Sequence, residues 1–339
     1  MRNKTRRFLD ALLLEVEKQI AVFEIKPETI YFGGGTPTML SISELDYFLS
    51  ELRKRFDTSA VREWTFEINP ATVSLEKAKL LRSLGVNRIS MGAQSWDDAV
   101  LKTLGRAHTS AQAEETFHTL REAEFKNVNL DLMFAVPGQT RAQWQQTLEK
   151  TIALRPEHVS AYCLTYEQDT EFFRKLNSGN FSQNDARDAE MFEDAMDTLS
   201  SAGFSHYEIS NYAQPGHESL HNFAYWNGAD YLGFGPSAFS TSGAHRWQNI
   251  PDSGQYMDRI FAGNSPVSFE ENLDPATKRG ERIAFGLRTN RGVPHRALNP
   301  WREEIAEFAG LGLVERKGAR VVLTKKGKLL ADSVAEAFV

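Results

Sequence analysis

The fold class of this chain is decided by one short stretch, TIYFGGGTPT at residues 29–38. Residues that favour a strand lead directly into a run of glycines, whose backbone adopts conformations barred to other residues. Such a run can gather N–H groups around a carboxylate or phosphate, or it can be a plain tight turn between a strand and a helix. It matches neither G-x-G-x-x-G nor a P-loop, since no Gly-Lys-Ser/Thr follows. The stretch therefore predicts the start of an α/β unit.

Further β-rich runs follow at intervals, and amphipathic segments separate them, as in parallel βαβ units. Capping-box patterns beginning at Ser41, Thr109 and Thr140 mark the starts of helices between these runs. The sequence therefore predicts an α/β fold with a parallel sheet. Its expected strands are Thr29–Gly33, Trp64–Ile68, Arg88–Gly92, Val128–Phe134 and Val159–Leu164.

The rest of the chain is patterned differently. We expect two helices within residues 171–200 and an irregular sheet-and-loop region, rich in glycine and aromatic residues, over 205–247. Residues 249–277 are rich in Pro, Ser, Asn and Asp, which predicts a linker. The expected division is a barrel-like part with an appended sheet at 1–248, this linker, and a small winged-helix-like module at 278–339.

Composition excludes several classes of protein. The chain has 339 residues, of which 41% are hydrophobic and 25% charged, so it is neither disordered nor an integral membrane protein. A net charge of −6 offers no basic field for a phosphate backbone, which argues against nucleic acid as a partner. The basic N-terminus continues into an amphipathic helix and not a secretory signal, which predicts a cytoplasmic protein and leaves peripheral membrane association open.

Polar side chains stand where predicted strands end. Glu67 lies at the end of one strand, Gln94 follows another and Asp131 interrupts a third, while Arg106 lies in the connection after Gln94. Ligands bind at the carboxyl ends of strands in parallel sheets, so these residues predict a site. Their alternatives are a helix-capping acid for Glu67 and a surface ion pair for Arg106. A charge inside an apolar strand is costly unless it is partnered, so Asp131 predicts a hydrogen-bond donor or a bound ligand nearby.

Two further interpretations concern histidine. His217, Glu218 and His221 match H-E-x-x-H, the zinc-hydrolase pattern, which requires a helix. Pro215 and Gly216 directly before it make a helix a poor expectation. His221 also lies close to aromatic residues that could stack on a flat macrocycle, which predicts an axial haem ligand. The alternative is a histidine bonded within a packed sheet.

Taken together, these segments resemble radical SAM proteins related to oxygen-independent coproporphyrinogen III oxidase, most closely the HemW-type haem chaperones. The resemblance is carried by the glycine run, Glu67, the Gln94 and Arg106 segments, residues 131–140, residues 207–213 and the segment from His221 to Trp226. It implies an open (β/α)₆ partial barrel that lacks its first strand here, followed by a C-terminal domain. It also implies that S-adenosylmethionine (SAM) is bound by Gly34, Gly35, Thr36, Glu67, Gln94, Arg106 and Asp131, and haem by His221.

One departure from that family is large. The family holds a [4Fe–4S] cluster on a Cys-x₃-Cys-x₂-Cys loop, whereas the single cysteine here, Cys163, provides neither such a site nor an internal disulfide. We expect either a truncated or late-assigned start or a real loss of the cluster. Without it, SAM would bind only weakly and this chain would be catalytically silent.

The functional prediction follows from the resemblance. It is a haem chaperone that binds haem and passes it to acceptor haemoproteins. The alternative is an oxygen-independent coproporphyrinogen III oxidase, which uses SAM and a [4Fe–4S] cluster. A zinc hydrolase through His217, Glu218 and His221 is a distant third.

Overall fold

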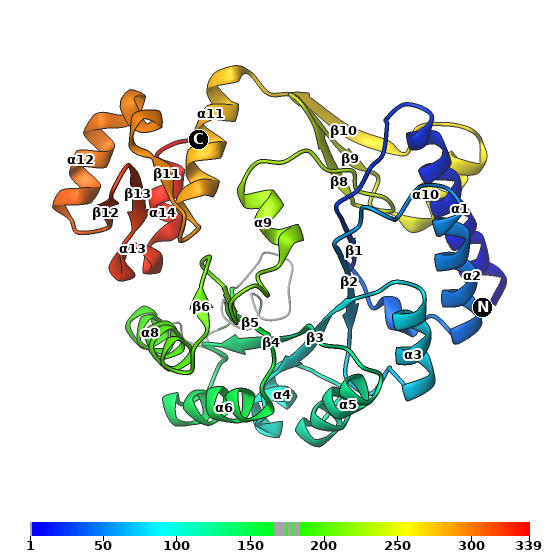
Figure 1. Ribbon diagram of the computed structural model, residues 1–339, viewed down its shortest axis with the longest axis horizontal. Helices are drawn as coiled ribbons and strands as arrows, with labels where there is room; N and C mark the ends of the chain where they lie inside the picture. The colour runs from blue at the N-terminus through cyan, green and yellow to red at the C-terminus, as the bar shows by residue number, and fades with distance from the viewer. Residues whose placement is uncertain (1, 166–173, 175–177, 179–183) are drawn as a thin grey trace.

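A curved, seven-stranded sheet forms the centre of the molecule (Figure 1). The structure is a computed structural model that describes residues 2–165, 174, 178 and 184–339. The strand order is β1-β2-β3-β4-β5-β7-β6, with β1 to β5 parallel and the last two antiparallel. The predicted parallel sheet is thus confirmed. Its strands are β1 Thr29–Phe32, β2 Glu63–Ile68, β3 Arg88–Gln94, β4 Val128–Phe134, β5 His158–Cys163, β6 Ser205–His206 and β7 Asn211–Ala213.

Helices cover the outer face of this sheet (Figure 1). The predicted capping boxes form at Ser41, Thr109 and Thr140, and each satisfies backbone donors at the start of a helix. Gly85 follows the cap of α3 with a φ of 109°, as is typical of a glycine that ends a helix. The helices are α1 Arg2–Ile20, α2 Ile42–Arg53, α3 Leu75–Ser83, α4 Asp98–Thr103, α5 Ser110–Glu122, α6 Arg141–Leu154 and α8 Asp185–Ser201, with the short 3-10 helix η1 Pro37–Met39 after β1.

The two faces of the parallel strands have opposite character. Apolar side chains such as Ile89, Leu130 and Val159 are fully buried within one large hydrophobic core. The residues that alternate with them along the strands are polar, and the register places four of them side by side across β2 to β5. These neighbours are Glu67, Ser90, Asn129 and His158. The sheet therefore turns a polar face toward the inside of its curve.

Residues 205–247 contain a helix that the sequence analysis did not expect. Helix α9, Leu220–Trp226, lies on the inner side of the curved sheet (Figure 1) and contacts β1. The predicted helix within 171–200 that is described is α8, and the first of the two lies outside the described residues.

The segment predicted as a linker, residues 249–277, holds regular structure instead. Helix α10, Ser253–Phe261, starts at the capping residue Asp252, and the edge strand of a three-stranded antiparallel sheet follows it. This sheet has the order β10-β9-β8, with β8 Phe239–Ser242, β9 His245–Asn249 and β10 Val267–Asn272. The prediction of a linker was wrong because β10 forms by pairing with β9, which lies well before it in the sequence. Such a pairing leaves no local sequence pattern. The domain boundaries themselves stay a prediction.

Helix α1 is held against α10 by a buried carboxylate. Glu15 is 2% exposed and accepts hydrogen bonds from Tyr256 Oη at 2.6 Å, Asn249 Nδ2 at 2.6 Å and the Gly235 N–H at 2.8 Å. Burial raises the pKa of Glu15, and these donors oppose the rise. The carboxylate therefore joins the N-terminal helix to the second sheet.

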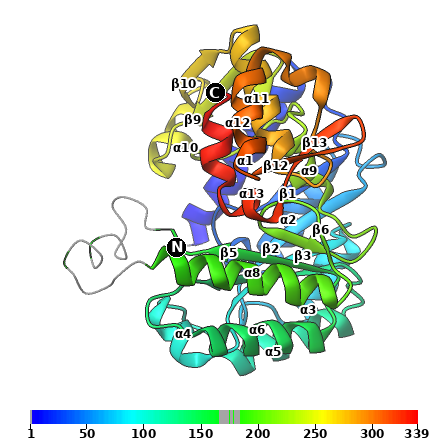
Figure 2. The ribbon, with the colours of Figure 1, turned by 90° about the vertical axis from the view of Figure 1, so that its left-hand side faces the viewer.

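A second core, around Ile283, Leu298 and Val321, lies in the C-terminal module, which Figure 2 shows grouped at the end of the molecule opposite α4, α5 and α6. The predicted helix near Trp301 and the strand near Val321 are both present. The module consists of α11 Pro275–Leu287, β11 Val293–Pro294, η2 His295–Trp301, α12 Arg302–Gly310, β12 Val314–Lys317, β13 Arg320–Leu323, α13 Lys325–Leu329 and α14 Ala331–Glu336. Over the described part of the chain, no helix has both the length and the apolar character that crossing a bilayer requires.

Candidate functional site

The glycine run after β1 combines one tight contact with an open backbone. A Cβ on Gly33 would lie 2.6 Å from Glu67 Cδ and from Tyr31 Cε1, so no larger residue fits there. A Cβ on Gly34 or Gly35 would meet nothing within 4 Å, and Gly34 has a φ of 76°. The backbone of Gly34 and Gly35 is therefore exposed where a ligand can approach it closely.

Glu67 faces this open backbone from the end of β2. Its Oε1 accepts a hydrogen bond from Tyr31 Oη at 2.7 Å, and the Gly34 N–H also donates to the carboxylate. Burial and the negative charge of Asp131 raise the pKa of Glu67, whereas these two donors oppose the rise. Two carboxyl groups near each other favour a ligand that brings positive charge or hydroxyl donors.

Asp131 has the partners that its position in an apolar strand requires. Its carboxylate accepts hydrogen bonds from Ser90 Oγ at 2.9 Å and Asn129 Nδ2 at 2.8 Å, and Ser160 also donates to it. Burial nevertheless raises its pKa. The prediction that Asp131 has hydrogen-bond donors is confirmed, and these donors come from β3, from β5 and from its own strand.

Arg106 interacts electrostatically with Asp131. Neighbouring protein atoms desolvate the guanidinium and lower its pKa, and the charge of Asp131 acts in the opposite direction. Neither a surface ion pair for Arg106 nor a helix cap by Glu67 is found among the described contacts. The charge of Arg106 is therefore close enough to that of Asp131 for the two to interact.

Gln94 and Thr36 lie at the same edge. Gln94 is 8% exposed and has a φ of 64°, in the left-handed region that is strained for a residue other than glycine. A Cβ on Gly92 would lie 2.9 Å from Gln94 Nε2, so the glycine makes room for this side chain. Thr36 Oγ1 accepts a hydrogen bond from Asn69 Nδ2 at 2.9 Å, just beyond β2. The structure thus gathers the predicted residues at one edge, and their assignment to SAM stays a prediction.

His221 lies in the first turn of α9 and not in a packed sheet. Its Nδ1 is 2.8 Å from Thr29 Oγ1 and its Nε2 is 3.1 Å from Tyr225 Oη. The ring also stacks on Tyr31, with centroids 5.0 Å apart and an angle of 23° between the planes. Burial lowers the pKa of His221, so the imidazole is neutral at pH 7.

The zinc-hydrolase arrangement is not formed. His217 and Glu218 precede the capping residue Ser219, so the pattern does not place two imidazoles on one face of a helix. Both ring nitrogens of His221 already have partners. In the ranges of the chain that the structure covers, no group of three or more His, Cys, Asp or Glu side chains is placed to hold a metal ion.

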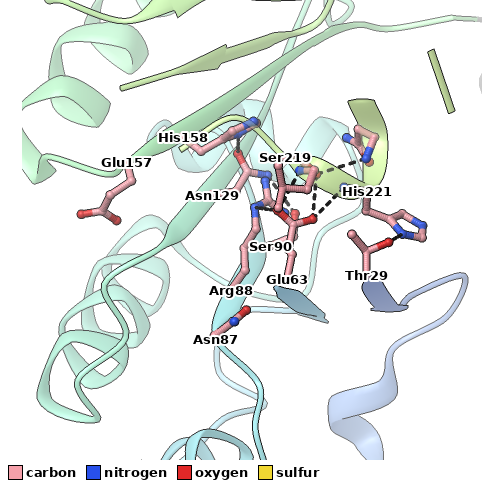
Figure 3. Close-up of polar contacts among 12 residues, drawn as sticks. Thr29, Glu63, Asn87, Arg88, Ser90, Asn129, Glu157, His158, Ser219 and His221 are labelled. Carbon is pink, nitrogen blue, oxygen red and sulfur yellow. Dashed lines mark hydrogen bonds and ion pairs between the residues drawn. The ribbon is translucent and has the colours of Figure 1, made fainter. Parts of the chain in front are cut away.

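Helix α9 is fixed to the sheet by a residue that the sequence analysis missed. The Glu63 carboxylate, 3% exposed, accepts hydrogen bonds from Ser219 Oγ at 3.2 Å and from the N–H groups of Leu220 at 2.8 Å and His221 at 3.0 Å (Figure 3). Arg88 Nε lies 4.0 Å from Glu63 Oε2, and both side chains are buried. A negative charge at a helix N-terminus is stabilising, so Glu63 sets the position of His221.

Other polar residues of the inner face were missed as well. His158 Nδ1 lies 2.7 Å from Asn129 Oδ1 (Figure 3), and its Nε2 lies 2.8 Å from Tyr207 Oη. Tyr31 was quoted only as part of a strand. A signal existed in the sequence, because a polar residue at every second position of each predicted strand indicates a polar face. That alternation was not used.

Comparison with known proteins identifies the family of this chain. The sequence model of the Radical SAM superfamily matches residues 2–151. "Heme chaperone HemW" from Lactococcus lactis subsp. lactis (strain IL1403) is 34% identical over 341 residues, covering 97% of this chain and 89% of the relative. "Heme chaperone HemW" from Bacillus subtilis (strain 168) is 34% identical over 343 residues, with coverages of 98% and 90%.

The fold also matches a solved structure over the whole chain. Coproporphyrinogen III oxidase (HemN) from Escherichia coli superimposes with a TM-score of 0.86 at 22% identity, covering 100% of this chain and 84% of that chain. At this identity the match shows the fold alone, and it confirms the predicted radical SAM-type α/β architecture. The identity to curated relatives over nearly the full chain is what decides the family. The chain belongs to the HemW family within the Radical SAM superfamily.

Proposed function

We propose that this protein is a haem chaperone, which binds haem through His221 and passes it to acceptor haemoproteins. The observation that carries the proposal is the contact that orients the His221 imidazole. Thr29 Oγ1 lies 2.8 Å from Nδ1, which is the arrangement that metal-binding histidines require, and burial lowers the pKa of His221 and so favours the neutral ring. The HemW relatives are named for the same activity.

The geometry favours Nε2 as the atom that binds iron. Nδ1 is held by the Thr29 hydroxyl against β1, whereas the partner of Nε2 is the hydroxyl of Tyr225, a side chain that is 38% exposed. Tyr225 can turn toward solvent without leaving a buried polar group unpaired. Haem binding then replaces one hydrogen bond, and the orientation of the ring is kept.

We propose further that Gly34, Gly35, Thr36, Glu67, Gln94, Arg106 and Asp131 hold SAM. The residues fit this ligand, because the open glycine backbone admits a close approach and two carboxyl groups favour hydroxyl donors and positive charge. Arg106 would face the carboxylate of the methionyl part. When it is bound and receives an electron, SAM supplies carbon-centred radical chemistry. The residues named here bind and orient it.

A [4Fe–4S] cluster does not fit the cysteines of this chain. Such a cluster needs several thiolates, and Cys163 is the single cysteine. It ends β5 as an exposed residue, yet neighbouring protein atoms desolvate its thiol and raise the pKa to about 11, which disfavours the thiolate. No step proposed here uses the cluster. The alternative function, oxidation of coproporphyrinogen III, needs the electron that a cluster supplies, whereas haem binding and transfer do not.

Titration with haem tests the proposal. Absorbance in the Soret region gives the affinity of the wild type and of His221→Ala, and His118→Ala on the outer helix α5 is the matched control. We expect His221→Ala to weaken binding by roughly tenfold or more, and His118→Ala to leave it unchanged. Transfer to an apo-haemoprotein should slow or stop when His221 is absent. Equal affinities for the wild type and both variants would contradict His221 as the haem contact.

A further inference from the structure

Tyr31 touches both proposed sites. Its hydroxyl donates to Glu67 Oε1 at 2.7 Å, and its ring stacks on His221 with centroids 5.0 Å apart. It lies within β1, so the backbone on either side of the contact is fixed by pairing with β2. One rigidly placed aromatic ring therefore lies between a carboxylate at the edge of the sheet and the imidazole on α9.

We propose that Tyr31 is a positioning residue through which a ligand at Glu67 weakens the binding of haem to His221. The inference rests on the proposed function, since it takes His221 as the haem contact and the edge around Glu67 as the SAM site. It adds a coupling between the two sites. SAM and haem would oppose each other, so arrival of SAM would favour release of haem to its acceptor.

The first step is the effect of Tyr31 on the imidazole. A phenol that donates a hydrogen bond to a carboxylate has a more electron-rich ring, and the pKa of Tyr31 is raised, so it remains a neutral donor. An imidazole that donates electron density to iron gains partial positive charge. Positive charge against the face of an aromatic ring is stabilised. The intact bond from Tyr31 to Glu67 therefore strengthens the hold of His221 on iron.

The second step is competition for Glu67. Its carboxylate already accepts from Tyr31 and from the Gly34 N–H, and the charge of Asp131 lies nearby. A ligand with hydroxyl groups or positive charge that bonds to Glu67 draws electron density away from the Tyr31 contact or displaces it. The ring then loses both its polarisation and its fixed orientation. By thermodynamic linkage, haem at His221 must weaken that ligand by the same factor.

The affinity of the folded chain for haem tests this without any need for SAM. The variants are Tyr31→Phe, which keeps the ring and removes the hydroxyl, Glu67→Gln, and the double variant. We expect each single variant to weaken haem binding, Tyr31→Phe by about three- to tenfold. The double variant should be no weaker than Tyr31→Phe, because the hydroxyl is the link and residues in one network are not additive.

Tyr256→Phe is the matched control. It also removes a tyrosine hydroxyl that donates to a buried carboxylate, Glu15, but it lies between α1 and α10. Its haem affinity should equal that of the wild type. Circular dichroism of each variant separates loss of fold from loss of affinity.

A second readout uses SAM itself. Saturating SAM should weaken haem binding in the wild type and leave Tyr31→Phe unaffected. Additive losses in the double variant, or wild-type affinity in Tyr31→Phe, would overturn the coupling even if SAM fails to bind. If His221→Ala leaves haem binding unchanged, the proposed function has failed. If His221→Ala weakens binding but the losses of Tyr31→Phe and Glu67→Gln add up in the double variant, only the coupling has failed.

Discussion

Two carboxylates in this molecule each accept a short hydrogen bond from a tyrosine hydroxyl, yet their surroundings differ. Glu15, between α1 and α10, is also bonded by Asn249 and the backbone of Gly235. Glu67, at the edge of the sheet, faces the like charge of Asp131 and an open glycine backbone. A carboxylate that protein donors saturate stabilises packing, whereas one beside a like charge costs stability that a ligand can recover.

Removal of Glu15 should give the largest effect on stability. In Glu15→Ala the Tyr256 hydroxyl, the Asn249 amide and the Gly235 N–H lose their acceptor in a buried place. We expect the free energy of unfolding to fall by about 3 kcal/mol, measured by urea denaturation. Haem affinity should not change once the variant is folded, since His221 lies elsewhere. A loss below about 0.5 kcal/mol would show that water replaces the carboxylate.

Asp131→Asn should change ligand binding more than stability, whereas Glu15→Ala should change stability alone. The amide removes the like charge beside Glu67 but keeps a similar shape, so we expect stability to change by less than about 1 kcal/mol. SAM binding, followed by equilibrium dialysis with radiolabelled SAM, should weaken in this variant. If Asp131→Asn instead destabilises the protein as much as Glu15→Ala, then Asp131 stabilises packing as Glu15 does.

The pH dependence of stability tests whether the charge of Asp131 is destabilising, and the raised pKa of Glu15 adds a background of the same sign in both the wild type and the variant. The folded state raises the pKa of both Glu67 and Asp131 above their ordinary values near 4, so it binds their protons more tightly than the unfolded chain does. Their contribution to stability therefore falls as pH rises from about 4 through the folded pKa values. Asp131→Asn should lose part of this decline. Unfolding curves of the wild type and the variant should thus differ most at neutral pH and converge in acid.

Haem binding should respond to pH through His221 in the opposite direction. Burial lowers its pKa below the ordinary value of 6.5, so the neutral, iron-binding form persists in the folded protein below pH 6.5. Haem affinity should stay constant as pH falls from 8 to about 6.5 and decline only in more acidic solution. A decline that is already half complete at pH 6.5 would show that His221 titrates like an exposed histidine.

The sequence was informative wherever structure is local. The parallel strands and the three capping boxes follow from residues within a few positions of each other. Helix α9 was missed because it is short, and because Glu63, the acceptor at its start, lies 157 residues before Leu220. Residues 249–277 were misinterpreted for the same reason, since β10 depends on pairing with β9.

In the candidate site too, local features were predictable and contacts between distant parts of the chain were not. The positions of Glu67 and Gln94 were predictable because the ends of parallel strands meet at one edge, and the need of Asp131 for donors was predictable because it lies within an apolar strand. The double contact of Tyr31 was not, because the distance from β1 to α9 depends on how the chain returns across the inner face. The Glu63–Arg88 pair beneath α9 was equally hidden, since no local pattern pairs residues on adjacent strands.

The smallest expected effect comes from Tyr225, and it tests which nitrogen of His221 binds iron. Tyr225→Phe keeps the aromatic contacts with His221 and Tyr231 but removes the hydroxyl 3.1 Å from Nε2. Haem then need not displace a hydrogen bond, so we expect affinity to rise by about threefold, the equivalent of a net bond worth about 0.7 kcal/mol. Thr29→Val, which frees Nδ1 instead, should lower affinity because the ring loses its fixed orientation. Soret titrations of both variants give the answer, and a reversal of the two signs would make Nδ1 the iron-binding atom.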